Sequence, residues 1–491
     1  MTDAAFLAWL KSSAAYRVVL IEAAVQIGGV ESVVYFATKP FTTGPGDAPA
    51  NTTYLPIATV GRLFTERLLL DGEGGLAAGE LEIENVGGAR DAWAGPGYIW
   101  SNRSIKAYIG DVRWGRADFR MIFNGIVADI APRGRQALAL QLRDKSQRLN
   151  TPISEVKLGG TGEQRDALLP IALGQVFNVT PILINAAILK YQVHAGAIDS
   201  IIEVRDNGAP VAFTPGIAAG TFQLQSAPAG VVTASVRGAA AGGYVDTAAQ
   251  LVKRLVTGYG KESDRFADAD LDLANIAAFN AAHQQAMGVY STARQNVLAA
   301  CQMLLSSVGA QLVMSRLGLA RLIKVALPAA GTPFEIRPEH VYGEITPGPR
   351  TEPVGAVKLG FAKNWTVQDA GTLANLPEAH KKLFIEEWLP AGKSDAFTIA
   401  TRRLSAEPVQ VDTMLLTRAD ADAEAQRRLD LWKAPRTTYE FEGVPELLAL
   451  ELGQAVTVYA PRFGMDAGVT GIVISLAPDW ETGRVTVGFL V

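Results

Sequence analysis

The sequence predicts an α+β fold that is mainly β, in which two β-barrel domains flank a small β-domain and an α/β module. The chain has 48 glycines and 25 prolines among 491 residues, which is typical of many turns that join many short strands. Apolar and polar residues alternate near both ends of the chain, as half-buried strands require. The period becomes that of amphipathic helices mainly in one central stretch, about residues 245–345.

The first predicted domain, residues 1–155, begins with a short helix and continues as strands. Residues 4–11 predict the helix. Two segments with alternating apolar residues follow, FNGIVADIAP (123–132) and QALALQL (136–142). A polar turn separates them, so the pattern predicts a β-meander that ends near residue 150.

Residues 156–243 predict the small β-domain, and residues 244–345 predict the α/β module. Asn207-Gly208 stands between two apolar runs, and both residue types tolerate the positive φ of a two-residue hairpin turn. Leu317-Gly318 predicts a second hairpin. The module's helices are expected from Thr247, as N-cap, to Gly258, at about 270–286 and at about 293–308.

The last predicted domain, residues 346–491, consists of strands with one inserted helix. Thr417 and Asp420 form a capping-box pattern at the start of this helix. Glu424 and Arg428 are spaced for an i,i+4 ion pair on it. The closing strands are expected at 455–459, 468–478 and 484–490.

Charged residues make up 19% of the chain, below the roughly 25% of ordinary soluble domains. We therefore expect much surface to be buried in cores or against partners. The net charge of −4 does not favour nucleic-acid binding. The longest apolar region, 168–189, contains Gln175 and Asn178 and is a poor membrane span. Asp3 and Lys11 interrupt the apolar N-terminus, so we expect production in a cytoplasm without a secretory signal.

We predict no catalytic, cofactor-binding or metal-binding residues, and therefore neither an enzyme nor a cofactor. Cys301 is the one cysteine, which excludes an intrachain disulfide and a cysteine metal cluster. Its leucine-rich surroundings favour a core residue. A helical zinc site needs two histidines at i and i+4, a spacing that the four histidines do not have: His194, His283, His340 and His380.

Four other stretches imitate known sites without completing them. The glycine-rich segment 71–80 precedes a predicted strand, whereas a phosphate cradle needs a helix there. AGKS (391–394) ends like a P-loop, but Glu387 occupies the place of its first glycine. Residues 268–275 lack the glycine and the bidentate glutamate of a calcium loop, and a helix N-terminus explains their aspartates better. Glu386 and Glu387 are adjacent on a predicted strand, so they point to opposite faces.

One short strand occurs twice in the sequence. GIVADIAP (125–132) and GIVISLAP (471–478) share Gly, Ile, Val, Ala and Pro. Before each copy stand an alternating strand and a loop with arginine and aromatic residues, and after each stand a polar turn and a last strand. This context predicts two related barrels, with four residues in their cores: Ile126, Ile130, Ile472 and Leu476.

Both ends of the chain carry motifs of a known family. The C-terminal LGQAVTVYAPRFGMDAGVTGIVISLAPDWETGRVTVGFL, with its Pro461–Gly464 loop and Asp479–Val485 hairpin, resembles the closing barrel of baseplate hub, or tail-tip hub, proteins of long-tailed, siphovirus-like bacteriophages. VVLIEAAV, GELEIENVGG and RSIKAYIGD resemble the first domain of the same proteins. LLSSVGAQLVMSRLGLARLIKV (304–325) resembles a further stretch, and the likeness is weakest over 160–240.

The resemblance implies a structural virion protein located at the tail tip or baseplate. Two tail-tube-like barrels per chain give a homotrimer six equivalent barrels, which adapt a hexameric tail tube to a threefold tip or fibre. The implied partners are distal tail and tail-tube proteins, the C-terminus of the tape-measure protein, and central fibre or tip proteins. DNA is expected to pass through the lumen without sequence-specific binding.

Two other functions stay open. A receptor- or carbohydrate-binding tail protein predicts an exposed aromatic platform in the small β-domain, which contains Phe177, Tyr191, Phe213 and Phe222. A cell-wall-degrading tail enzyme, the less favoured alternative, predicts a pocket with paired carboxylates.

Overall fold

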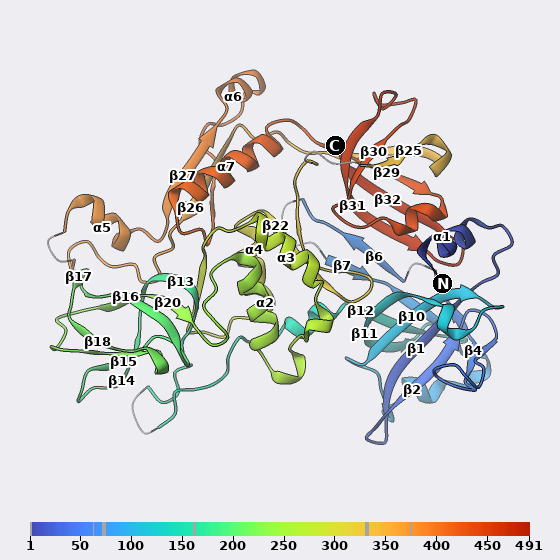
Figure 1. Cartoon of the computed structure of the whole chain (residues 1–491), viewed down its shortest axis with the longest axis horizontal. Helices are drawn as coiled ribbons and strands as arrows, with labels where there is room; N and C mark the ends of the chain where they lie inside the picture. Colours follow the sequence, from blue (N-terminus) through green and yellow to red (C-terminus); the bar gives the residue numbers. More distant parts are fainter. Residues whose placement is uncertain (1, 62, 71–74, 161–163, 329–332, 374–375) are drawn as a thin grey trace. The chain divides into compact units, whose positions relative to one another are not determined.

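The computed structural model describes residues 2–61, 63–70, 75–160, 164–328, 333–373 and 376–491. Strands dominate and the sheets are curled (Figure 1), so the mainly β, α+β fold class is confirmed. The chain separates into two compact units. Unit 1 comprises Met1–Gln147, Leu312–Thr351 and Arg436–Val491, and unit 2 comprises Arg148–Gln311 and Glu352–Pro435. The finer division into four domains stays a prediction.

The described residues of unit 1 contain one α-helix and most of the long strands. They are α1 (Asp3–Lys11), β1 (Arg17–Ile27), β2 (Val30–Ala37), β3 (Phe41–Thr42), β4 (Thr53–Pro56), β5 (Ala58–Thr59), β6 (Phe64–Arg67), β7 (Gly75–Ala78), β8 (Glu80–Glu84), β9 (Tyr98–Ile99), β10 (Ser104–Asp111), β11 (Arg120–Pro132), β12 (Ala137–Arg143), β23 (Ala320–Lys324), β24 (Phe334–Ile336), β25 (Val341–Arg350), β29 (Thr437–Gly443), β30 (Ala455–Val458), β31 (Val469–Asp479) and β32 (Arg484–Leu490). Strand β22 (Ala310–Met314) straddles the boundary with unit 2.

Two curled sheets make up most of unit 1 (Figure 1). The first has the order β3-β4-β2-β1-β10-β11-β12-β8-β5, with β9 paired to β1. The second has the order β24-β30-β31-β32-β29-β25, and the β6–β7 hairpin is attached to its strand β31. In the sequence, the hairpin lies between β5 and β8, which both belong to the first sheet. In the fold, it pairs with the second sheet instead.

Unit 2 consists of smaller sheets and helices. Its strands are β13 (Ile171–Val179), β14 (Ile182–Asn185), β15 (Lys190–Gln192), β16 (Ile198–Asp206), β17 (Ala209–Pro210), β18 (Phe213–Gly216), β19 (Thr221–Leu224), β20 (Val232–Ala239), β21 (Gly288–Ser291), β26 (Ala356–Phe361), β27 (Leu389–Ser394) and β28 (Gln410–Asp412). Its helices are α2 (Ala248–Gly258), α3 (Leu273–Ala282), α4 (Val297–Ser306), α5 (Glu378–Ile385), α6 (Ala396–Arg402) and α7 (Arg418–Trp432). The sheets have the orders β17-β16-β20-β13-β21, β14-β15-β19-β18 and β27-β26-β28.

Several local predictions are confirmed. Asn207 and Gly208 have φ of 46° and 79° and close the two-residue hairpin between β16 and β17. Gly318, with φ of 73°, lies in the turn between β22 and β23. At the start of α7, the Thr417 hydroxyl accepts a hydrogen bond from the Asp420 amide at 3.2 Å, which satisfies one of the free N–H groups of the first turn.

Two local expectations are wrong. The described part of residues 352–435 forms three α-helices instead of one: α5 begins after Pro377, and α6 begins where Asp395 accepts the Thr398 amide at 2.8 Å. Glu386 is the C-cap of α5 and does not lie on a strand. Thr247 is the N-cap of α2, as predicted; its hydroxyl donates to Asn280 Oδ1 at 2.5 Å rather than accepting a capping bond from the helix.

Candidate functional site

The repeated segment forms the same strand twice. Both copies run antiparallel to the strand that follows, and Ile130 opposite Leu140 corresponds to Leu476 opposite Val487. The register shifts once in each ladder, after Val127 in β11 and after Val473 in β31. A bulge at the same place in both strands fixes which side chains face inward on either side of it.

The equivalence extends over five strands in each sheet. We call β5, β8, β12, β11 and β10 the N-motif, and β25, β29, β32, β31 and β30 the C-motif. Both have this pairing order. On the outer side, Leu140 pairs with Leu81 as Val487 pairs with Phe441. The next strand also matches, because the residues two positions further along β8 and β29 pair with the first residues of β5 and β25.

The turns that precede β10 and β30 match as well. Asn102 has φ of 60° and Gly453 has φ of 77°. Their amides donate to the carbonyls of Val127 and Val473, at 2.8 and 2.9 Å. Asn and Gly are the residue types that adopt such positive φ at the lowest cost.

The glycine that opens each repeat is required by a close backbone approach. A Cβ at Gly125 would lie 2.7 Å from the carbonyl oxygen of Arg143, and one at Gly471 would lie 2.2 Å from that of Leu490. Arg143 and Leu490 occupy equivalent places on the partner strands. The shared Gly of the two octapeptides therefore has a common geometric cause.

The four predicted core residues are buried. Their exposed fractions are 5% for Ile126, 8% for Ile130, 3% for Ile472 and 1% for Leu476. This confirms them as core positions of two equivalent motifs.

A buried ion pair lies where the β6–β7 hairpin reaches the second sheet. Glu66 on β6 is 5% exposed, and its carboxylate accepts the backbone amide of Arg316 at 2.9 Å and faces its guanidinium at 3.6 Å. Burial raises the pKa of Glu66, while Arg316 opposes the shift. The Arg316 carbonyl accepts the amide of Asn124 on β11. The β22–β23 turn thus contacts β6 and the N-motif together.

The histidines and the cysteine considered in the sequence as metal ligands or reactive groups do not form a cluster among the described residues. Among the described residues, no group of three or more His, Cys, Asp or Glu side chains is placed to hold a metal ion. His194 is buried, and its Nδ1 accepts the Ala172 amide at 3.0 Å, so burial lowers its pKa to about 4. Burial likewise raises the pKa of the Cys301 thiol, which lies in the apolar core.

The stretches that imitate known sites have structural roles where they are described. Residues 391–394 belong to strand β27. Asp272 caps α3 by accepting the Asn275 amide at 3.0 Å, which confirms the helix N-terminus predicted for 268–275. Residues 71–74 of the glycine-rich segment lie outside the described residues, and 75–78 form β7.

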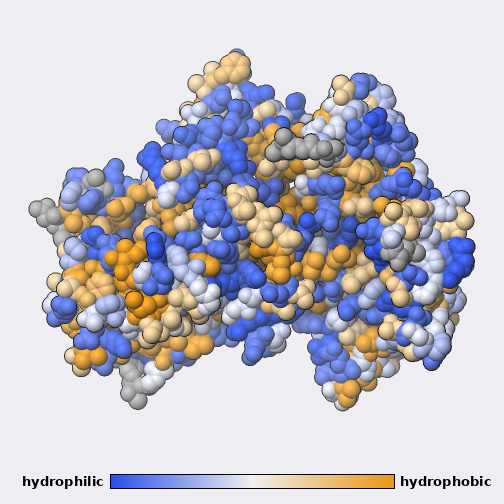
Figure 2. Space-filling view, viewed as in Figure 1, coloured by the Kyte–Doolittle hydropathy of each residue, from blue (hydrophilic) through white to orange (hydrophobic). Residues whose placement is uncertain are grey.

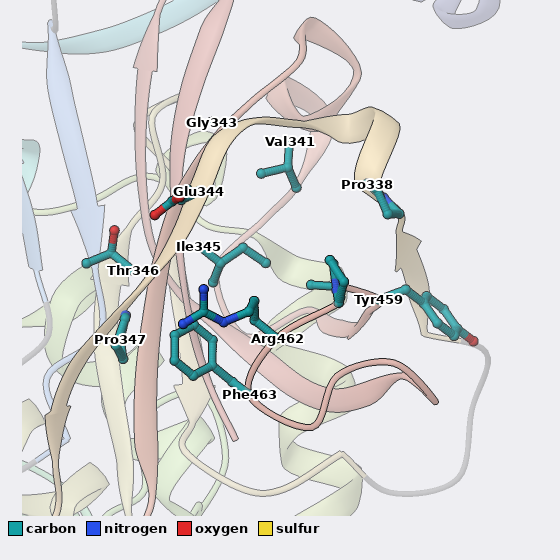
Figure 3. Close-up of a pocket in the computed structure, with 12 residues that line it drawn as sticks. Pro338, Val341, Gly343, Glu344, Ile345, Thr346, Pro347, Tyr459, Arg462 and Phe463 are labelled. Carbon is teal, nitrogen blue, oxygen red and sulfur yellow. The ribbon is translucent and has the colours of Figure 1, made fainter.

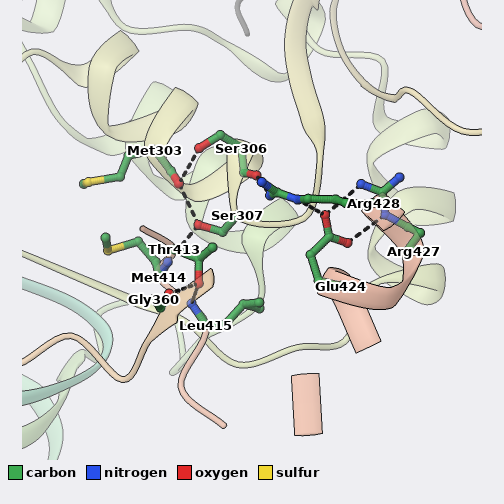
Figure 4. A network of polar contacts seen from close by, with 10 residues as sticks. All are labelled: Met303, Ser306, Ser307, Gly360, Thr413, Met414, Leu415, Glu424, Arg427 and Arg428. Atoms are coloured by element: carbon green, nitrogen blue, oxygen red, sulfur yellow. Dashed lines mark hydrogen bonds and ion pairs between the residues drawn. The ribbon is translucent and has the colours of Figure 1, made fainter. Parts of the chain in front are cut away.

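A charged network joins α4 to α7 (Figure 4). Glu424 is 6% exposed and accepts from both Arg427 and Arg428 at 2.7–2.8 Å. Burial opposes its charge, but the two arginines hold the pKa of the carboxyl below its usual value. Arg428 also donates to the carbonyl of Ser306 at 2.6 Å, offsetting the partial negative charge at the end of α4. The predicted Glu424–Arg428 pair is confirmed.

A mainly apolar cavity of 430 Å³ lies between β25 and the loop after β30 (Figure 3). This loop contains the Pro461–Gly464 segment. Phe463 has φ of 58° and packs on Tyr439 at 5.7 Å between ring centroids. Ile345, Arg462 and Phe463 point toward one another across the cavity (Figure 3).

Three of the four aromatic residues named for the small β-domain form a core rather than a platform, and the fourth, Phe177, is half-buried and lines a cavity with Phe384. Tyr191 and Phe222 are 8% and 1% exposed and stack at 5.3 Å, and Phe213 meets Phe222 edge-on at 6.1 Å. Figure 2 shows hydrophobic residues over β16 and β20. The large exposed side chains of the small β-domain include Ile202 and Ile217, which are aliphatic. This weakens the carbohydrate-binding alternative, since sugar platforms use exposed aromatic rings.

No family model matches the chain, and no curated protein matches it. Among solved structures, it is similar to the tail protein from Neisseria meningitidis MC58, at 10% identity and a TM-score of 0.40, with 96% of each chain covered. It is similar to the 43 kDa tail protein of prophage MuSo2 from Shewanella oneidensis, at 12% identity and 0.38, covering 96% of this chain and 98% of that one. A chain of a native gene transfer agent virion gives 15% identity and 0.43, covering 70% and 91%. These identities and TM-scores mark a distant likeness.

Among the described residues, no helix is long and apolar enough to cross a membrane.

Proposed function

We propose that this chain is a structural, non-catalytic protein of a phage tail, which forms a homotrimeric hub at the distal end of the tail. The observation that carries the proposal is the pair of five-stranded motifs in one register within unit 1. A trimer presents six such motifs. It therefore meets a sixfold tail tube with one surface while keeping threefold symmetry for a tip or fibre.

The hub motifs recognised in the sequence support the same assignment. The Pro461–Gly464 loop lines the cavity beside β25, and the Asp479–Val485 segment is an ordered hairpin. In it, Asp479 Oδ1 accepts the amides of Glu481 and Thr482 at 3.0 and 3.1 Å. Both recognised features thus lie in or beside the C-motif.

The partners of such a hub are a second and third copy of the chain, the distal tail and tail-tube proteins, the end of the tape-measure protein, and the central fibre or tip. The net charge of −4 fits a conduit that repels DNA. A strongly basic lumen in the trimer would contradict the conduit.

Cryo-electron microscopy of virions tests the proposal. We expect this chain as a threefold ring between the tail tube and the tip, with N- and C-motifs alternating around the axis. Finding it as a monomeric distal fibre, or outside the virion, would overturn the hub.

A further inference from the structure

The two motifs differ at one edge. In the C-motif, β30 pairs with β31 only as far as Ile472, and β6 continues on the same side. Arg67 lies opposite Ser475, and the Leu68 amide donates to the carbonyl of Ile474 at 2.8 Å. The edge of β31 beyond its bulge is therefore filled by a strand.

The same edge of the N-motif is open. Strand β10 pairs with β11 only as far as Ile126, and within the described part of the chain no other strand continues on that side. The Ile130 amide is bound instead by the Asp129 side chain, at 2.9 Å. The turn Asp91–Ala94 lies close to β11 without a backbone hydrogen bond to it, and Asp129 is exposed.

Register identifies the segment that corresponds to β6 in the C-motif. Thr59 of β5 and Tyr342 of β25 are equivalent, because they pair with Glu82 and Glu442 at matching places. After Thr59 the chain leaves the first sheet and forms β6, which pairs with the second sheet. In the C-motif the corresponding segment is Gly343–Arg350.

This segment pairs with β29 through an irregular ladder. It is exposed along nearly its whole length. Its ladder with β29 shifts twice, between Tyr342 and Thr346 and between Pro347 and Arg350. The 430 Å³ cavity lies behind its first part (Figure 3).

We propose that the open edge of β11, residues 128–132, binds the segment Gly343–Arg350 of a second copy of this chain. Within the chain, the N-motif's segment fills the C-motif's edge. Between chains, the C-motif's segment fills the N-motif's edge, so that one kind of contact closes a ring of alternating motifs. The proposal rests on the hub function and adds the residues that join its subunits.

Charge supports the pairing. Arg67 and Arg350 each stand eight residues after the equivalent Thr59 and Tyr342. In the chain, Arg67 lies opposite Ser475. The counterpart of Ser475 is Asp129, so the proposed contact places the exposed Arg350 opposite an exposed carboxylate.

Charge reversal in the purified full chain tests the contact by sedimentation velocity. We expect Asp129→Arg and Arg350→Asp each to weaken self-association about tenfold, because like charges then face each other. The double variant, with both changes, is expected to recover wild-type association. Arg67→Asp is the matched control and is expected to leave association unchanged, since its partner residue is uncharged.

A disulfide trap gives a second readout. Cys301 is the only cysteine and is buried, so a chain with Asp129→Cys and Arg350→Cys is expected to form interchain disulfides up to a closed trimer under oxidation. Each single cysteine variant is expected to give no such trimer.

The outcomes separate this inference from the hub itself. If the wild-type chain associates but the reversals are silent, or the double variant fails to recover, the contact is wrong and the hub stands. If the wild-type chain is a monomer at every concentration and the trap yields no trimer, both the contact and the self-assembling hub fail.

Discussion

The N-motif and the C-motif have the same strand order, register and bulge, although few of their side chains are identical. What they share is what the backbone geometry requires: a glycine where two strands approach closely, and a positive-φ residue at the entering turn. Core positions vary in type, as Leu140 and Val487 illustrate, because apolar side chains of similar volume fill a core about equally well. The motifs differ where they meet other chain segments, at the edge that β6 covers in only one of them.

Among changes that compare the two motifs, truncation of a core residue is expected to have the largest effect on the free energy of unfolding. Leu476→Ala and Ile130→Ala each lower the free energy of unfolding by about 2–5 kcal/mol. Leu476 stands at the upper end, because it is 1% exposed and covered by β6, whereas Ile130 is 8% exposed at an open edge. Urea unfolding followed by tryptophan fluorescence measures both. A larger loss for Ile130→Ala would contradict the assignment of the open edge.

Acidification is expected to lower the stability of unit 2 through His194, a residue that has no counterpart in the motifs of unit 1. Burial lowers the pKa of His194, in unit 2, from 6.5 to about 4, so the unfolded chain takes up the proton first. The stabilisation is complete above pH 6.5 and is lost as the pH falls through 4, to a total of about 3 kcal/mol. His194→Gln is expected to flatten this part of the stability–pH curve. An unchanged pH dependence in that variant would show that another group titrates.

Both motifs have a glycine, Gly125 or Gly471, where the backbone of the neighbouring strand approaches closely. Gly471→Ala is expected to cost about 1–3 kcal/mol through forced backbone shifts, and Gly125→Ala less. The reason is that the added Cβ would lie 2.2 Å from a carbonyl oxygen in the first case and 2.7 Å in the second. Thermal unfolding of the two variants checks the order. Equal, negligible losses would show that the shared glycine has no geometric cause.

Local patterns predicted the parts of the fold that local physics controls. The repeat, the Asn207-Gly208 turn and helix α7 follow from residue type and spacing. The equivalence of β25 to β5 was not predictable, since VYGEITPGPR contains four glycine or proline residues, which have little strand propensity, and lacks clear alternation. The pairing of β6 with β31 joins residues about 400 positions apart, which no local pattern encodes. No enzyme site was predicted, and the edge that we propose for assembly emerges only when the registers of the two motifs are compared.

The smallest expected effect concerns the open edge itself. Asp129→Ala removes the side chain that binds the Ile130 amide. Because this edge is exposed, water takes over the amide, and the loss in unfolding free energy is expected to be about 0.5 kcal/mol. Ser475→Ala is the matched change in the C-motif and is expected to cost less, since β6 covers that edge whatever the side chain at 475. Both are measured on dilute, dissociated chain, so that subunit contacts do not enter. If Asp129→Ala instead cost as much as a core truncation, Asp129 would hold the fold together. The open edge would then be a structural element of the N-motif, and the difference between the motifs would no longer point to assembly.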